Sequence, residues 1–161
     1  MRDLHAELQK LDLSIALSLL DERLGVEADP LFAFEMNVTK AKLLSSQGKT
    51  TAAIDLLIES SRSSAADESA SYFAAEMMVE DGQILRAIEF LEAAEYQIGK
   101  TGNTYFRDCI YLLHAYCEAI TGRGGRALEL LGEVVDEDEA LFWLRVETLI
   151  SVSNVREIAS R

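Results

Sequence analysis

The sequence predicts an all-α protein in which helices of ordinary length follow one another through short turns. Apolar residues recur at intervals of three and four along almost the whole chain of 161 residues, which is the period of a helix with one buried face. No segment alternates between apolar and polar residues as a half-buried strand does. Glycine, asparagine and aspartate stand between the periodic segments, where they favour helix ends.

The expected helices are defined by this periodicity and by the residues at their ends. Five glycines follow periodic segments, where a left-handed residue ends a helix at little cost; they are Gly25, Gly48, Gly82, Gly99 and Gly122. Asp29 before Pro30 is the pattern of an N-cap followed by a proline in the first turn. We therefore expect helices over about 2–10, 12–24, 31–47, 51–62, 67–81, 84–99, 103–121, 125–135, 138–152 and 154–160.

The chain also repeats itself. The stretch GKTTAAIDLL begins at Gly48, and GQILRAIEFL begins 34 residues later at Gly82, with Gly, Ala, Ile and Leu in the same places. A third copy begins at Gly122. In each copy an alanine stands five residues after the glycine and a leucine nine residues after it. This arrangement predicts helical hairpins, in which a small residue lets two antiparallel helices come close together.

The pattern resembles the tetratricopeptide repeat (TPR), a 34-residue helix-turn-helix unit with small residues at fixed positions of both helices. The matching small residues are Ala41 and Ala53, Ala75 and Ala87, and Ala115 and Ala127. The resemblance covers about residues 34–134 and implies TPR-like hairpins stacked in a right-handed superhelix, with about three complete units and partial units at both ends. We expect a single domain over residues 1–161.

Two alternative sites are disfavoured by their context. Gly48, Lys49 and Thr50 look like the end of a phosphate-binding loop, but Leu43 stands where the first glycine of that motif is required, and the preceding residues predict a helix instead of a strand. The acidic run EVVDEDEA, residues 133–140, is expected to be a loop and the first turn of a helix, where carboxylates favour the positive end of the helix dipole.

Composition narrows the class of partner. The chain has 28 Asp and Glu against 15 Lys and Arg, a formal net charge of −13. Because a nucleic-acid binder needs clustered basic residues, we expect no nucleic acid as partner. The charge favours a basic or amphipathic segment of another protein. The apolar stretch LDLSIALSLL, residues 11–20, contains Asp12 and is expected to be an amphipathic helix, so we predict no targeting peptide, no membrane association and a cytoplasmic location.

The sequence predicts no enzyme, no metal site and no cofactor. His5 and His114 lack the spacing of a metal or catalytic motif, and His114 lies in the apolar segment YLLHAYC, where a packing histidine is expected. Cys109 and Cys117 stand eight residues apart in one expected helix, about 12 Å along its axis at 1.5 Å per residue, which is too far for a disulfide. Two reduced core cysteines agree with a cytoplasmic compartment.

The TPR resemblance implies where a partner binds. The first helix of each unit lines a concave groove, and we expect the protein to be a non-catalytic interaction module, an adaptor, regulator or chaperone, that holds a peptide or helix there. The residues lining this peptide-binding groove are expected to be Val38, Lys42, Tyr72, Phe73, Glu76, Glu80, Leu112 and Tyr116.

Several alternatives remain open at this point. The aromatic side chains could pack between neighbouring helices, or a terminal helix of the same chain could fill the groove. The protein could be an acidic inhibitor or immunity protein that covers a basic partner with its outer surface. A structural module that closes a homodimer or a larger homo-oligomer is the third possibility.

Overall fold

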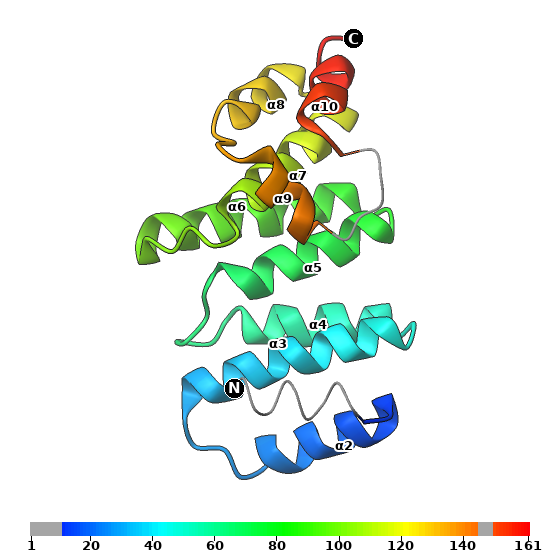
Figure 1. Cartoon of the computed structure of the whole chain (residues 1–161), viewed down its shortest axis with the longest axis vertical. Coiled ribbons are helices and arrows are strands. Elements are labelled where there is room, and N and C mark those ends of the chain that lie inside the picture. The colour runs from blue at the N-terminus through cyan, green and yellow to red at the C-terminus, as the bar shows by residue number, and fades with distance from the viewer. Residues whose placement is uncertain (1–10, 145–149) are drawn as a thin grey trace. The chain divides into compact units, whose positions relative to one another are not determined.

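The computed structural model describes residues 11–144 and 150–161, and every regular element in these ranges is a helix (Figure 1). The prediction of an all-α protein is therefore confirmed for the described part of the chain. The helices are α2 (Leu13–Leu24), α3 (Pro30–Ser46), α4 (Thr50–Ser60), α5 (Glu68–Glu80), α6 (Ile84–Thr101), α7 (Arg107–Ile120), α8 (Gly124–Leu131), α9 (Glu137–Trp143) and α10 (Val152–Ala159).

Some predicted boundaries need correction. The predicted helix over 2–10 lies outside the described residues. Gly99 lies inside α6, which ends instead at Gly102 with φ 72°, so α7 begins later than predicted. Gly25 caps α2 with a right-handed φ of −66°. The expected helix over 138–152 ends at Trp143, and residues 145–149 of it are not described.

The three repeated glycines make the same turn three times. Gly48, Gly82 and Gly122 have φ values of 75°, 75° and 81°, in the left-handed region that favours glycine. The N–H of the residue after each glycine donates to the carbonyl five residues back, at 3.0, 2.8 and 2.9 Å respectively. Each glycine N–H donates to the carbonyl three residues back. This pair of bonds is the Schellman motif, so the predicted helix ends are confirmed at these three positions.

The turns join three helical hairpins, α3 with α4, α5 with α6, and α7 with α8, and the two helices of each hairpin contact each other along their length. The small residues that define the repeat are fully buried in all three hairpins; they are Ala41, Ala53, Ala75, Ala87, Ala115 and Ala127. Alanine at these positions lets the helix backbones approach, as the repeated pattern predicts.

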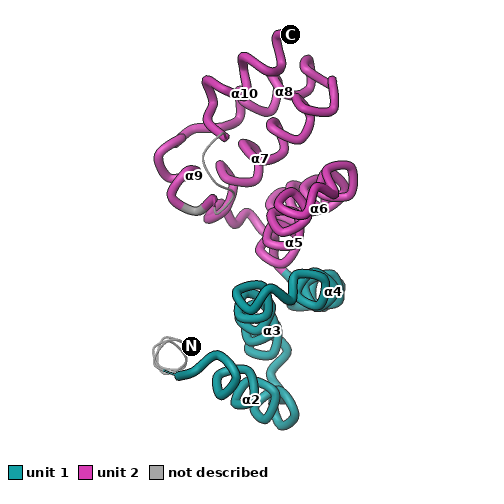
Figure 2. Tube along the Cα trace, turned by 90° about the vertical axis from the view of Figure 1, so that its right-hand side faces the viewer, with its two compact units in different colours: residues 1–66 teal, residues 67–161 magenta. Residues whose placement is uncertain are grey.

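The chain forms two compact units, residues 1–66 and 67–161, shown in different colours in Figure 2. In unit 1, α2 packs on α3. Ala16, Leu20 and Met36 form a buried cluster there. Asp29 caps α3 by accepting from the Leu31 N–H at 3.0 Å, which confirms the predicted N-cap before Pro30.

Unit 2 is organised around α7. This helix contacts α8 of its own hairpin and α6 of the preceding one, and α9 and α10 pack against it as well. Within α7 the buried residues include Cys109, Leu112, Leu113 and His114. The unit therefore has one helix at its centre to which the later segments of the chain attach. The expectation of a single domain over residues 1–161 stays a prediction.

Candidate functional site

The residues that the sequence assigns to a groove lie in both units. Val38 and Lys42 belong to α3 of unit 1, where Val38 is buried and Lys42 is half-buried. The other six belong to α5 and α7 of unit 2. Four of those six are buried, namely Tyr72, Phe73, Glu76 and Leu112. Tyr116 is half-buried and Glu80 is exposed.

The buried aromatic residues of α5 pack against the loop that precedes α7. The ring centroid of Tyr72 lies 5.0 Å from that of Phe73 and 5.3 Å from that of Phe106, and the Phe73 and Phe106 rings meet edge to face at 5.3 Å. The Tyr72 hydroxyl donates to Glu76 Oε1 at 3.4 Å, and burial raises the pKa of Tyr72 well above its ordinary value. These side chains form part of the core of unit 2, and their assignment to a partner-binding groove stays a prediction.

One side of α7 is covered by a later segment of the chain itself. Helix α9 contacts α7 and lies beside it in both views (Figures 1 and 2). Ala140, in the middle of α9, is fully buried. This arrangement matches the alternative in which a terminal helix of the same chain covers part of the predicted groove.

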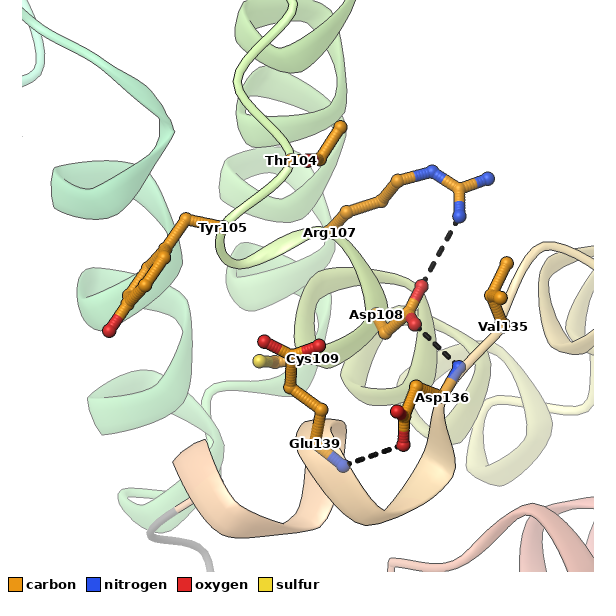
Figure 3. Close-up of a pocket in the computed structure, with 8 residues that line it drawn as sticks. All are labelled: Thr104, Tyr105, Arg107, Asp108, Cys109, Val135, Asp136 and Glu139. Atoms are coloured by element: carbon orange, nitrogen blue, oxygen red, sulfur yellow. Dashed lines mark hydrogen bonds and ion pairs between the residues drawn. The ribbon is translucent and has the colours of Figure 1, made fainter.

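An open cleft remains between the N-terminal end of α7 and α9, wholly within unit 2 (Figure 3). Its volume is about 520 Å³. Two apolar side chains at its edge are exposed, Tyr105 by 52% and Val135 by 81%. The complete lining is Thr104, Tyr105, Arg107, Asp108, Cys109, Val135, Asp136 and Glu139. We call this space the α7–α9 cleft.

The carboxylates of the α7–α9 cleft differ in how they are engaged. Asp108 accepts from Arg107 Nη1 at 3.2 Å and, through its other oxygen, from the Asp136 N–H at 2.7 Å. Asp136 in turn caps α9 by accepting from the Glu139 N–H at 3.0 Å. These contacts, drawn as dashed lines in Figure 3, fix the backbone of the cleft. The exposed Glu139 carboxylate makes no such contact within the described residues.

The cleft contains a cysteine that is poorly suited to nucleophilic chemistry. Cys109 is buried at the floor of the cleft beneath Glu139 (Figure 3). Burial, together with the nearby Glu76 and Asp108 carboxylates, raises the pKa of the Cys109 thiol to about 12. Because the thiolate is the reactive form of cysteine, a thiol with this pKa is almost entirely inert at neutral pH.

His114 belongs to a buried polar network that links three helices. Its Nδ1 meets Glu95 Oε1 of α6, and its Nε2 lies 3.2 Å from Glu118 Oε1. Glu118 Oε2 faces Arg123 Nε at the start of α8. A neutral imidazole carries one N–H, so satisfying both contacts requires an additional proton on the ring or on a carboxyl group. Since His114 is only 1% exposed, it is out of reach of a substrate.

A second, more polar cavity of about 440 Å³ lies beside this network. Its carboxylates are already paired with cations of the chain, because Glu133 accepts from Arg107 at 3.0 Å and Glu129 from Arg126 at 3.1 Å. The lining residues are Glu95, Tyr111, Arg126, Glu129, Leu130 and Glu133. Such compensated charges hold α6, α7 and α8 together and leave little attraction for a charged ligand.

The other candidate sites from the sequence are also placed by the structure. Residues 48–50 join α3 to α4, so the segment before Gly48 is helical, as predicted, where a phosphate loop follows a strand. The acidic run ends in α9, whose first turn contains Glu137, Asp138 and Glu139, which confirms the loop-and-first-turn prediction. No group of three or more metal-ligating side chains comes together within residues 11–144 and 150–161.

Comparisons with known proteins identify no relative. The chain matches no protein-family model, no curated protein and no solved structure. Among the helices that the structure describes, none combines the length and apolar character needed to cross a membrane.

Sequence reasoning missed the residues that form the α7–α9 cleft. Tyr105 lies in a stretch predicted as helix, and Val135 and Glu139 belong to the acidic run predicted as a loop and the first turn of a helix. The available signal was the sequence TGNTY, in which Gly102 followed by Asn103 marks a loop that presents Tyr105 at a helix boundary.

Proposed function

We propose that the protein is a non-catalytic protein-binding module that holds a basic or amphipathic segment of another protein in the α7–α9 cleft. The observation that carries this proposal is the open cleft of about 520 Å³, in which exposed apolar side chains stand next to carboxylates. Clefts of this volume lie in the range that holds small ligands, which leaves room for side chains of a bound peptide. Tyrosine is also among the residues that most often contribute binding energy at interfaces.

The charge of the site supports a basic partner. Asp108 is compensated by Arg107, while Asp136 and Glu139 add negative charge at the rim. The net charge of −13 favours the approach of a cationic segment and opposes association of two copies of this chain. A Lys or Arg side chain of the partner would pair with the carboxylates of the cleft. Apolar residues next to it in the partner would pack on Tyr105 and Val135.

The hairpin architecture supports the same class of function. We propose that the three hairpins are TPR-like units, on the basis of their repeated Schellman turns and buried alanines. In such proteins binding depends on surfaces formed by successive helices and not on a catalytic constellation. The free, buried thiols of Cys109 and Cys117 support a reducing, cytoplasmic setting.

The site proposed here differs from the one expected from sequence. Tyr72, Phe73 and Leu112 support the cleft from the core, and the contact residues are Tyr105, Val135 and Glu139. Glu80 and Tyr116 retain accessible surface on the same unit.

The proposal is tested with a partner isolated by affinity capture and then purified. Tyr105→Ala is expected to weaken its affinity by about 1–3 kcal/mol, the usual effect of truncating an aromatic contact. Tyr96→Ala is the matched control, because Tyr96 is an exposed tyrosine of α6 outside the cleft. Glu139→Gln is expected to slow association with the partner at low salt. Glu92→Gln serves as its control, because Glu92 is an exposed residue of α6 outside the cleft.

Calorimetry or surface plasmon resonance measures both effects on variants whose circular dichroism and melting temperature match the wild type. Equal affinities for the Tyr105→Ala and Tyr96→Ala proteins would exclude the α7–α9 cleft as the binding site. Turnover of a substrate by the purified protein would instead exclude the non-catalytic assignment.

A further inference from the structure

A buried glutamate lies beneath the loop that forms one wall of the α7–α9 cleft. Glu68, the first residue of α5, is 0% exposed. Its Oε1 accepts a hydrogen bond of 2.6 Å from the side-chain amide of Asn103. Its Oε2 is enclosed without a hydrogen-bond partner. An ionised carboxylate in this position lacks the hydrogen bonds that its second oxygen needs.

Asn103 connects this buried carboxyl group to the cleft. The Asn103 side chain donates to Glu68 with its amide nitrogen, and its Oδ1 accepts from the Tyr105 N–H at 3.2 Å. Tyr105 is one of the two exposed apolar residues of the cleft. Asn103 itself is exposed, so it stands between the Glu68 carboxyl group and solvent.

The neighbouring residue limits how far the loop can move. Phe106 is held by the Tyr72 and Phe73 rings, with centroid distances of 5.3 Å to both, and so anchors the end of the loop next to α7. The segment that depends on Glu68 is therefore residues 102–105. Its conformation, together with the edge-to-face contact of the Tyr105 and Phe106 rings at 4.8 Å, decides where the Tyr105 ring lies relative to the cleft.

The electrostatic surroundings disfavour the charged form of Glu68. Burial raises the pKa of Glu68 above its ordinary value, and the adjacent Asp67 carboxylate raises it further. The Glu68 backbone N–H and the Asn103 amide act in the opposite direction and are outweighed. Asp67, the N-cap residue of α5, and Asn103 on the facing loop are the side chains that act on this carboxyl group, and no cation is among them.

We propose that Glu68 and Asn103 form a proton-controlled clasp that holds Tyr105 in place at the α7–α9 cleft. With Glu68 neutral, the clasp is closed and the loop has the conformation seen here. When Glu68 ionises, its Oε2 requires hydrogen bonds from water. The Asn103 side chain then moves away from Glu68 so that water can reach Oε2. Tyr105 then loses its support from Asn103 Oδ1, and residues 102–105 become free to rearrange.

This regulatory role rests on the proposed function of the cleft, because it makes binding depend on pH. A partner that needs Tyr105 in its present position binds more tightly when Glu68 is neutral. Coupling between two sites is commonly worth a change in affinity of roughly 5-fold or more. We therefore expect affinity to fall by about that factor as pH rises through the ionisation of Glu68.

The clasp itself is tested by NMR on the full chain without any partner. The carboxyl carbon of Glu68, the side-chain amide protons of Asn103 and the backbone amide of Tyr105 are followed from acidic to alkaline pH. All three are expected to titrate together, with one midpoint above the ordinary pKa of a glutamate carboxyl group. Separate midpoints, or a Glu68 midpoint at that ordinary value, would overturn the clasp.

Two variants separate the roles of the partners. Glu68→Gln keeps an oxygen acceptor for Asn103 and cannot ionise, so the Asn103 and Tyr105 signals are expected to lose this titration and to stay near their acidic positions. Asn103→Ala removes the link, so the Tyr105 signal is expected to become independent of pH while Glu68 still titrates. A Tyr105 titration that survives in either folded variant would contradict the proposal. If a variant does not fold, the joint titration of Glu68, Asn103 and Tyr105 in the wild-type protein still tests the clasp.

The effect on binding is tested with the purified partner. Its affinity for the wild type and for Glu68→Gln is measured at pH values below and above the midpoint of the NMR titration. Wild-type affinity is expected to fall roughly 5-fold with rising pH, and Glu68→Gln affinity to change much less. Equal pH dependence in the two proteins would overturn the regulation. Unchanged affinity in Tyr105→Ala would overturn the proposed function alone, because the NMR titration of the clasp does not depend on a partner.

Discussion

Gly124 lies against the carbonyl group of Ala159, so closely that a Cβ added to Gly124 would stand 2.1 Å from that oxygen and 3.0 Å from the carbonyl carbon. Gly124 begins α8 and Ala159 ends α10. The contact is between two backbones, and neither can turn away as a flexible side chain does. The absence of a side chain at this position is therefore what allows α10 to pack on α8.

We expect Gly124→Ala to displace α10 and to lower the free energy of unfolding by about 1–3 kcal/mol, as other overpacked contacts do. Gly125→Ala is the matched control, because nothing lies within 4 Å of a Cβ there and its φ is not left-handed. Alanine is the better helix former, so this control is expected to be neutral or to stabilise by up to about 1 kcal/mol. Urea unfolding measures both. Equal stability of the two variants would show that α10 does not depend on this contact.

The buried alanines of the hairpins give a second prediction. Ala87 faces the inside of the α5–α6 hairpin and is fully buried, whereas Ala93 of the same helix is exposed. Ala87→Leu is expected to destabilise the protein by about 1–3 kcal/mol because a larger side chain separates the helices. Ala93→Leu is expected to change stability by less than about 0.5 kcal/mol. Thermal or urea unfolding compares them, and an Ala87→Leu protein as stable as Ala93→Leu would contradict close packing at this crossing.

The cysteines should be protected from alkylation in the folded protein. Burial raises the pKa of both Cys109 and Cys117 to about 12, so only about one thiol in 10⁴ is ionised at pH 8. We expect iodoacetamide to leave the native protein unmodified on a timescale that fully alkylates both cysteines in denaturant. Mass spectrometry distinguishes the two states. Rapid modification of Cys109 in the native protein would indicate a reactive thiol in the α7–α9 cleft.

Glu68 should make stability fall as pH rises. Burial raises the pKa of Glu68 above the ordinary glutamate value of 4.5, so between the unfolded and folded pKa values the native state binds more protons than the unfolded state. The free energy of unfolding therefore decreases with pH across that window. The contribution of Glu68 is complete below the unfolded pKa and is lost as pH passes the folded one.

Glu68→Gln removes this dependence because the amide does not titrate. The stability of the variant relative to wild type is expected to increase as pH rises above 4.5, as measured by urea unfolding at a series of pH values. Glu92→Gln, on the exposed side of α6, is the control and should follow the wild type. A constant difference between Glu68→Gln and wild type at all pH values would show that Glu68 has the same pKa in both states.

The part of the fold that could be predicted is the part encoded by local signals. Gly48, Gly82 and Gly122 each end a helix because glycine alone adopts the left-handed conformation without cost. The alanines mark the crossings because only a small residue fits there. The choice between Gly99 and Gly102 as the end of α6 was not predictable in this way, since either glycine can take a left-handed conformation and the better cap is decided by the loop to α7.

The site was harder to predict because it depends on contacts between distant segments. Every residue of α5 from Glu68 to Val79 is buried, polar ones included, so helical periodicity could not separate its inner face from an exposed one. The hydrogen bond between Glu68 and Asn103 joins residues 35 positions apart. The α7–α9 cleft likewise has Tyr105 and Glu139 in its lining, and no short sequence motif predicts that these two residues lie near one another.

The hairpins have a consequence for how the protein folds. Each Schellman turn connects two helices that are neighbours in sequence, so much of the packing forms between residues that are close along the chain. Chains dominated by local contacts pass the folding barrier quickly, because little loop-closure entropy is lost before contacts form. Hairpins are also natural units of partial opening. Native-state hydrogen exchange should therefore show each hairpin losing protection as a block, with α10 exchanging before the α5–α6 pair.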